Sequence, residues 1–218
     1  ELLKVNEMTH FDLNTIQSMP PFAFLAKIHP SWFSTLFDKL TQNDKILFIS
    51  AFTNRKEELA SAFNLPPQFI SLTPIAKDFI IQRIYTVMLS LSGILPFSFL
   101  THEPFFHLLT LSSDQLTSLI YLLGLYDIAP EMKMVVKSNQ IKGIQEALTP
   151  KEVRFLKAIE QDENGVTFGK VGLASWDGNS EQLRNILHKR GINRVAKAFS
   201  SASKSFITHL IYLLPKEE

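Results

Sequence analysis

The 218-residue sequence contains no cysteine. Thiol catalysis, disulfide bonds and cysteine-ligated zinc or iron–sulfur centres are therefore excluded within this chain. An excess of one charge is also lacking, because 22 Lys and Arg residues face 21 Asp and Glu residues, giving a net charge of +1. No global electrostatic field therefore favours nucleic acid or an acidic membrane as a partner.

Targeting and membrane-spanning signals are weak. The first ten residues, "ELLKVNEMTH", lack the basic and apolar regions of a signal peptide. The stretch from residue 84 to 101, "IYTVMLSLSGILPFSFLT", carries no charge over a length close to that of a membrane span. Gly93, Pro96 and five hydroxyl residues interrupt it. We therefore expect a buried helix that ends near Gly93, and not a transmembrane helix.

What the sequence has in abundance is apolar, helix-forming residues. Hydrophobic residues make up 45% of the chain, and 18 phenylalanines stand against 2 Trp and 4 Tyr. This composition is that of a globular protein with a core rich in phenyl rings. Apolar residues recur at helical spacing almost throughout, so we predict an all-α fold with a short irregular or β segment near residues 166–175.

Capping signals predict where the helices of the first half begin and end. In "HPSWF", Pro30 favours an extended His29 and places a helix start at Ser31. Further apolar helical spacing covers residues 44–52, and Asn54 is the expected cap of the next helix. Thr73 and Pro74 then open a long helix that runs to about Gly93.

In the second half, Ser112 is expected to cap a helix that stops at Gly124, and a shorter helix covers residues 138–147. Thr149-Pro150-Lys151-Glu152 is the clearest start signal, because Thr and Glu can form a reciprocal capping box. The last two helices are predicted over residues 180–189 and 192–214, joined at Gly191, with a break in "SSASKS". A shift in composition divides an apolar helical part, 1–130, from a more basic helical part, 131–218, and we expect both to pack as one unit.

No motif in the chain supports catalysis or a bound cofactor. In "HEPFFH", His102 and His107 are five residues apart, about 140° around a helix, so the pair does not match the zinc motif HExxH. "GVTFGKVG" lacks the spacing of a phosphate loop, and the chain has no GxSxG element. We therefore predict no catalytic, cofactor-binding or metal-binding residues, and no small-molecule substrate.

Positive charge is concentrated in "LHKRGINRVAKAF". A helix–Gly–helix hairpin with this charge could read DNA, or it could meet an acidic protein partner with its outer face. Aromatic residues do not interleave the cluster for base stacking, which favours a protein. The candidate partner-binding residues here are Arg184, Lys189, Arg190, Arg194 and Lys197, and Arg190 and Arg194 can form forked bonds to carboxylates.

Three stretches resemble a known family: an early apolar segment that runs into "HPSWF", the helix "IQRIYTVMLSLSGIL", and "LLTLSSDQLTSLIYLLGL". Together, over residues 22–128, they resemble the SctK (YscK) family of bacterial type III secretion. The resemblance implies a non-enzymatic cytoplasmic protein of the sorting platform. Such a protein links the inner-membrane ring to the pods that carry SctQ and SctL. Trp32 and Phe33 are further candidate partner contacts, although burial in the core is the more common role of such residues.

Overall fold

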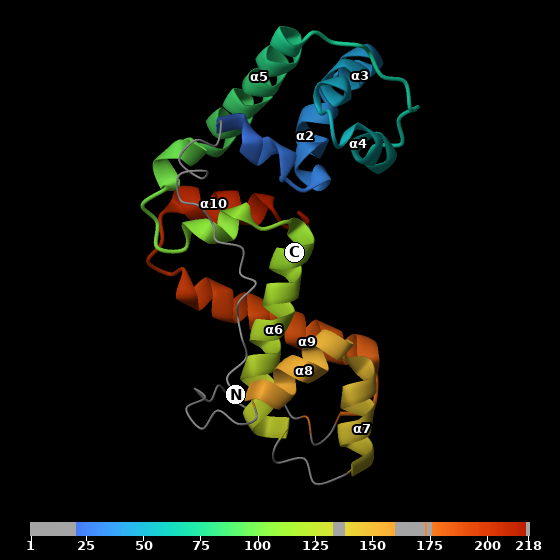
Figure 1. Cartoon of the computed structure of the whole chain (residues 1–218), viewed down its shortest axis with the longest axis vertical. Coiled ribbons are helices and arrows are strands. Elements are labelled where there is room, and N and C mark those ends of the chain that lie inside the picture. The colour runs from blue at the N-terminus through green and yellow to red at the C-terminus, as the bar shows by residue number, and fades with distance from the viewer. Residues whose placement is uncertain (1–20, 133–137, 160–172, 174–175, 217–218) are drawn as a thin grey trace. The chain divides into compact units, whose positions relative to one another are not determined.

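The computed structural model describes residues 21–132, 138–159, 173 and 176–216. These residues form helices and no strand (Figure 1), which confirms the predicted all-α fold. The expected irregular or β segment near residues 166–175 lies outside the described residues, apart from Leu173. The described helices are η1 (Pro21–Ala26), η2 (Pro30–Phe33), α2 (Ser34–Phe37), α3 (Gln42–Ala51), α4 (Lys56–Ala62), α5 (Pro74–Ser92), η3 (Phe97–Leu100), η4 (Phe106–Thr110), α6 (Ser113–Met132), α7 (Ser138–Ala147), α8 (Pro150–Ile159), α9 (Ser180–Ala198) and α10 (Lys204–Tyr212), where η marks a 3-10 helix.

Two compact units divide the chain. Unit 1 comprises Glu1–Ser113 and Ala202–Glu218, and unit 2 comprises Asp114–Ser201. This division differs from the parts 1–130 and 131–218 expected from composition. The C-terminal helix α10 packs against η3 and η4 of the N-terminal region, so both ends of the chain contribute to unit 1.

Side-chain caps define several helices of unit 1. The Thr41 hydroxyl accepts a hydrogen bond at the start of α3, and Thr73 does the same for α5, as the sequence predicts for Thr73. Gly93, with φ of 60°, ends α5 in the left-handed conformation. Two predicted caps are wrong. Arg55, and not Asn54, occupies the N-cap position of α4. His29, and not Ser31, caps η2, because the His29 Nδ1 atom accepts a hydrogen bond from the Ser31 amide.

Phenylalanine rings fill the core of unit 1. Phe33, Phe48 and Phe52 lie with ring centroids 5.4 to 5.7 Å apart, and Phe37 joins the same cluster. A second cluster brings Phe24 of η1 against Phe97 of η3 at 5.3 Å. The rings of the two clusters meet in edge-to-face and stacked contacts, the arrangements that aromatic pairs favour.

Helix α8 of unit 2 begins with the predicted capping box. The Thr149 amide donates to Glu152 Oε2 at 2.7 Å, and the Glu152 amide donates back to Thr149 Oγ1 at 3.4 Å. This reciprocal pair fixes the start of α8. Helix α7 covers the predicted residues 138–147. Apolar residues of α6, α7, α8 and α9 then enclose a core that includes Trp176.

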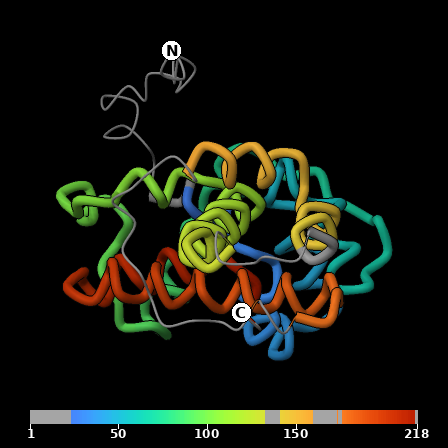
Figure 2. Tube along the Cα trace, turned by 90° about the horizontal axis from the view of Figure 1, so that it is seen from below, coloured from blue at the N-terminus to red at the C-terminus, as the bar shows by residue number. Residues whose placement is uncertain are grey.

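Two glycines that were expected to end helices lie instead inside helices. Gly124 sits within α6 and Gly191 within α9, and neither has a positive φ. A Cβ at Gly124 would lie 2.0 Å from the Leu187 carbonyl oxygen, and one at Gly191 would lie 1.9 Å from that of Ile120. The two helices therefore cross with their backbones in direct contact (Figures 1 and 2), which only glycine permits at these positions.

The predicted hairpin around Gly191 is therefore wrong, because α9 continues from Ser180 to Ala198. The break expected in "SSASKS" is confirmed, since α9 ends just before it at Ala198 and Ser203 within it caps α10. The uncharged stretch 84–101 ends its helix at Ser92. No described helix combines the length and the hydropathy that a membrane crossing requires.

Candidate functional site

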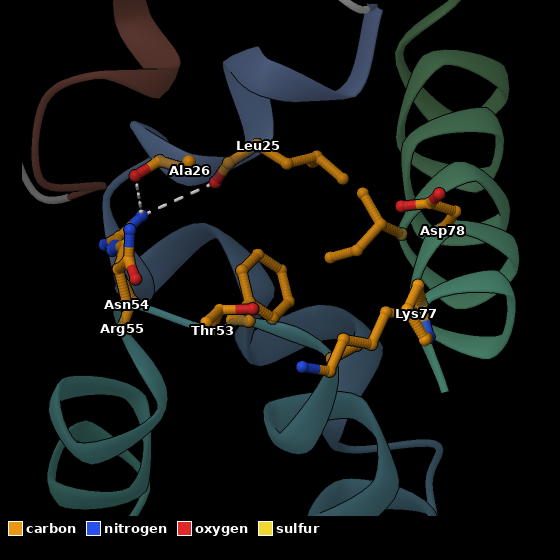
Figure 3. Close-up of a pocket in the computed structure, with 11 residues that line it drawn as sticks. Leu25, Ala26, Thr53, Asn54, Arg55, Lys77 and Asp78 are labelled. Atoms are coloured by element: carbon orange, nitrogen blue, oxygen red, sulfur yellow. Dashed lines mark hydrogen bonds between the residues drawn. The ribbon is translucent and has the colours of Figure 1, made fainter. Parts of the chain in front are cut away.

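A concave pocket in unit 1 opens between η1, the end of α3 and the first turns of α5 (Figure 3). Its volume is about 470 Å³. Leu25, Phe52 and Ile81 give it an apolar lining, while Lys77 and Asp78 of α5 contribute one charge of each sign. The size and the apolar lining are typical of a cavity that accepts a side chain or a small molecule.

Arg55 fixes one wall of this pocket. Its Nη1 donates hydrogen bonds to the carbonyl oxygens of Ala26 and Ile28, both at 2.8 Å. Its Nε and Nη2 bind the two carboxylate oxygens of Glu58 at 2.8 and 2.7 Å. The hydrogen bonds and the charge of Arg55 lower the pKa of the Glu58 carboxyl. Arg55 therefore clamps the end of η1 to the start of α4, and its donors are committed to the fold.

Next to the pocket, α5 presents large apolar side chains to solvent. Ile75 is 83% exposed and Phe79 is 68% exposed. The two residues are four apart and share one face of α5, whereas Pro74, Lys77, Asp78 and Ile81 line the pocket on the adjoining face. We call Ile75 and Phe79 the apolar face of α5. A single exposed apolar residue is ordinary, but a pair beside an apolar pocket is typical of a contact surface.

A second exposed group lies at the other end of α5 and just beyond it. Leu91, Leu95 and Phe99 are 62%, 54% and 66% exposed. Among the described residues, eight large apolar side chains are exposed, and all belong to unit 1: Ile70, Ile75, Phe79, Leu91, Leu95, Phe99, Phe105 and Ile211. The sequence does not predict this set, because an apolar helix gives no sign of which face is left uncovered.

The motif "HPSWF" joins the two ends of unit 1. Trp32 is partly exposed, donates its Nε1 hydrogen to the Leu214 carbonyl at 2.8 Å and packs edge-on against Tyr212. The His29 amide donates to the Tyr212 carbonyl at 2.8 Å. Phe33 is fully buried, so it is a core residue and offers no surface to a partner. These contacts support the interpretation of "HPSWF" as a structural connection between the two ends of unit 1.

Two of the basic candidates on α9 make ion pairs inside unit 2. Arg184 Nη1 lies 2.6 Å from Glu152 Oε1, and Arg194 Nε and Nη2 lie 2.6 and 2.5 Å from Asp127 Oδ1. The Arg184 guanidinium lies over the Tyr121 ring, and that of Arg194 over Tyr126. Burial raises the pKa of Glu152, but hydrogen bonds from Arg184 and Thr149 outweigh it, so the pKa is lowered overall. These pairs attach α9 to α8 and to α6.

The remaining basic candidates lie on the other side of α9. Lys189 and Lys197 are exposed, and Arg190 is half-buried. The sequence placed all five cations in one cluster, but helix geometry separates them into an inward pair and an outward group.

Of the two weaker motifs, only the histidine pair lies within the described residues. His102 follows η3 and His107 belongs to η4, and among the described residues no three His, Asp or Glu side chains gather as a metal site requires. "GVTFGKVG" lies outside the described residues.

Comparison with known proteins adds no relative: no protein-family model matches the chain, and no curated protein and no solved structure matches it.

Proposed function

We propose that this protein is a non-enzymatic adaptor of a type III secretion sorting platform. In this role it links the inner-membrane ring to the SctQ- and SctL-bearing pods at the cytoplasmic face of the inner membrane. The observation that carries the proposal is the concentration of exposed apolar side chains on unit 1, above all on the apolar face of α5. Exposed apolar groups of this kind mark protein contact sites. The resemblance of residues 22–128 to the SctK family supports the same role and falls mainly within unit 1.

Ile75 and Phe79 fit a partner better than solvent. A Phe or Ile side chain that passes from water into an interface contributes about 1.5 to 3 kcal/mol. The adjoining pocket offers space for a partner side chain, with Lys77 and Asp78 available for polar contacts at its rim. An apolar centre with polar groups around it is the usual composition of a protein interface.

A pull-down of the full chain with the inner-ring cytoplasmic domain and with a SctQ-type protein tests this proposal. We expect binding to at least one of them, and a loss of at least about tenfold in affinity for the double variant Ile75→Asp, Phe79→Asp. Gln42→Asp, Asn43→Asp is the matched control, since both residues are exposed on α3 in the same unit. Binding to neither protein, or equal binding by the double variant, would refute the proposal.

A helical DNA-binding regulator is the alternative function. The exposed cations of α9 favour it, although the hairpin that suggested it is one continuous helix. A gel-shift assay with genomic fragments at near-physiological salt decides between the two, because non-specific phosphate attraction weakens as salt rises.

A further inference from the structure

The pocket of unit 1 is surrounded by polar side chains that the fold does not use. Lys77 and Asp78 line it from α5, and Thr53 and Asn54 line it from the turn between α3 and α4. Within the part of the chain that the structure describes, the side chains of these four residues form no hydrogen bond and no ion pair. Arg55 differs, because its donors are bound to backbone carbonyls and to a carboxylate. Uncommitted polar groups around an apolar cavity are typical of a ligand-binding site.

Two of these polar groups carry opposite charges. Lys77 and Asp78 are neighbours in the sequence, and together with Pro74 and Ile81 they fall within an arc of about 100° on the pocket side of α5. Figure 3 shows the Lys77 side chain extending from α5 across the pocket. A ligand that carries only a carboxylate would be attracted by Lys77 and repelled by Asp78, and the reverse holds for a ligand that carries only an ammonium. A ligand with both groups complements both side chains.

We propose that this pocket binds a small zwitterion with a bulky apolar body, of the class of the free aromatic and aliphatic amino acids. Leu25, Phe52 and Ile81 would surround the apolar body, while Lys77 binds the carboxylate and Asp78 the ammonium. The volume of about 470 Å³ lies in the lower part of the usual range for small-molecule sites, about 300 to 1,000 Å³, which favours a compact ligand. The inference goes beyond the adaptor role and does not rest on it, because binding needs no partner protein.

The apolar wall of the pocket belongs to the core of unit 1. Leu25 and Phe52 are both buried, and the Phe52 ring packs against Phe33 at 5.7 Å between centroids. Arg55 holds the end of η1 beside this wall through its 2.8 Å hydrogen bond to the Ala26 carbonyl. A wall that is fixed by core packing loses little conformational freedom when a ligand enters, so more of the contact energy appears as affinity.

The test titrates the isotope-labelled full chain, without a partner, with three ligands that share one aromatic ring. L-Phenylalanine carries both charges, 3-phenylpropionate only the carboxylate, and 2-phenylethylamine only the ammonium. NMR chemical shifts at pH 7 and near-physiological salt report the affinity of each. We expect phenylalanine to bind with a dissociation constant of about 1 mM, and at least about threefold tighter than either single-charge ligand. The shifted amides should belong to η1, the end of α3 and the start of α5.

Two variants separate the charges. Lys77→Met keeps the length of the side chain and should weaken phenylalanine and 3-phenylpropionate at least about threefold without weakening 2-phenylethylamine. Asp78→Asn should weaken phenylalanine and 2-phenylethylamine without weakening 3-phenylpropionate. Arg83→Met is the matched control, because it removes an exposed cation that lies about 180° around α5 from Pro74, and it should leave all three affinities unchanged.

A third variant tests the cavity itself. Ala26 is an exposed residue of the pocket wall, so Ala26→Phe should fill the space without disturbing the core and should abolish binding of all three ligands. Absence of phenylalanine binding, equal affinity for the three ligands, or full binding by Ala26→Phe would overturn the proposal.

Discussion

Phenylalanine is distributed unequally between the two units: fifteen of the 18 residues fall in unit 1, and only Phe155, Phe168 and Phe199 fall in unit 2. Unit 1 combines the 19-residue α5 with several short helices, and rings contact rings at many places in its core. Unit 2 is built around longer helices, with a core in which Leu and Ile predominate. Aromatic rings fill irregular gaps between short elements, whereas long helices can pack regularly with aliphatic side chains.

Ion pairs follow the same division. Among the described residues of unit 1, Arg55 pairs with Glu58 and Lys56 with Glu57, both within one turn of the chain. In unit 2 they connect helices that are far apart in sequence, as Arg194 and Asp127 show. The exposed surfaces differ as well, apolar on unit 1 and basic along α9. Binding through unit 1 should therefore resist salt, and binding through α9 should weaken with salt.

The largest expected effect tests the aromatic core of unit 1. Phe33→Ala removes a fully buried ring that contacts Phe48 and Phe52, and should lower the free energy of unfolding by about 4 kcal/mol. Chemical denaturation measures the change. Phe99→Ala is the control, since that ring is 66% exposed and its loss should cost less than about 1 kcal/mol. Similar losses in both variants would contradict an aromatic core centred on Phe33.

Unit 2 should instead be sensitive to a single methyl group at its crossing. Gly191→Ala places a Cβ 1.9 Å from the Ile120 carbonyl oxygen, so the helices must separate and the free energy of unfolding should fall by about 3 kcal/mol. Hydrogen exchange should show faster exchange in α6 and α9. In the control Gly143→Ala, the new Cβ meets only the Trp176 side chain at 3.4 Å, and stability should hold or rise. Slower exchange in Gly191→Ala would refute the close crossing.

Gly191 also shows where sequence reasoning reached its limit. A glycine after a basic helical run predicts a helix end, because glycine is the usual residue at that position. The same residue is required where two helix backbones touch, and only the tertiary contact distinguishes the two cases. The start of α8 was predictable because Thr149 and Glu152 interact within one turn. Local chemistry is visible in the sequence, and contacts across the fold are not.

The candidate surfaces follow the same rule. The cluster of cations on α9 could be predicted from the sequence, but its division into inward Arg184 and Arg194 and outward Lys189 and Lys197 depends on which partners α6 and α8 supply. The apolar face of α5 could not be predicted, since Ile75 and the pocket-lining Ile81 belong to the same apolar helix. Whether a side chain is exposed depends on the elements that pack around its helix, and the sequence of one helix does not show which these are.

A smaller effect tests the long-range ion pairs of unit 2. Glu152→Gln keeps the side-chain size but removes the charge that pairs with Arg184, and should lower the free energy of unfolding by about 2 kcal/mol at pH 7. The pKa of Glu152 is lowered in the folded protein, so its contribution is present above the unfolded pKa and is lost as pH falls through the folded pKa. The variant should therefore differ from the parent at pH 7 and approach it in acid. Glu146→Gln, at an exposed site on α7, is the control and should show neither effect.

The smallest effect should appear in unit 1, where His209 is buried against the rings of Phe24 and Phe97. Burial lowers the pKa of His209, so the folded state holds the ring neutral while the unfolded state takes up a proton below about pH 6.5. Stability is therefore full above pH 6.5 and falls as the pH drops from there toward the folded pKa. His209→Phe keeps an aromatic ring in the cluster and removes the titration, so its denaturation midpoint should change less between pH 7 and pH 5.5 than that of the parent. His107→Phe, at an exposed position, should leave the parent's pH dependence in place. An unchanged pH dependence in His209→Phe would show that the acid sensitivity of unit 1 comes from groups outside this ring cluster.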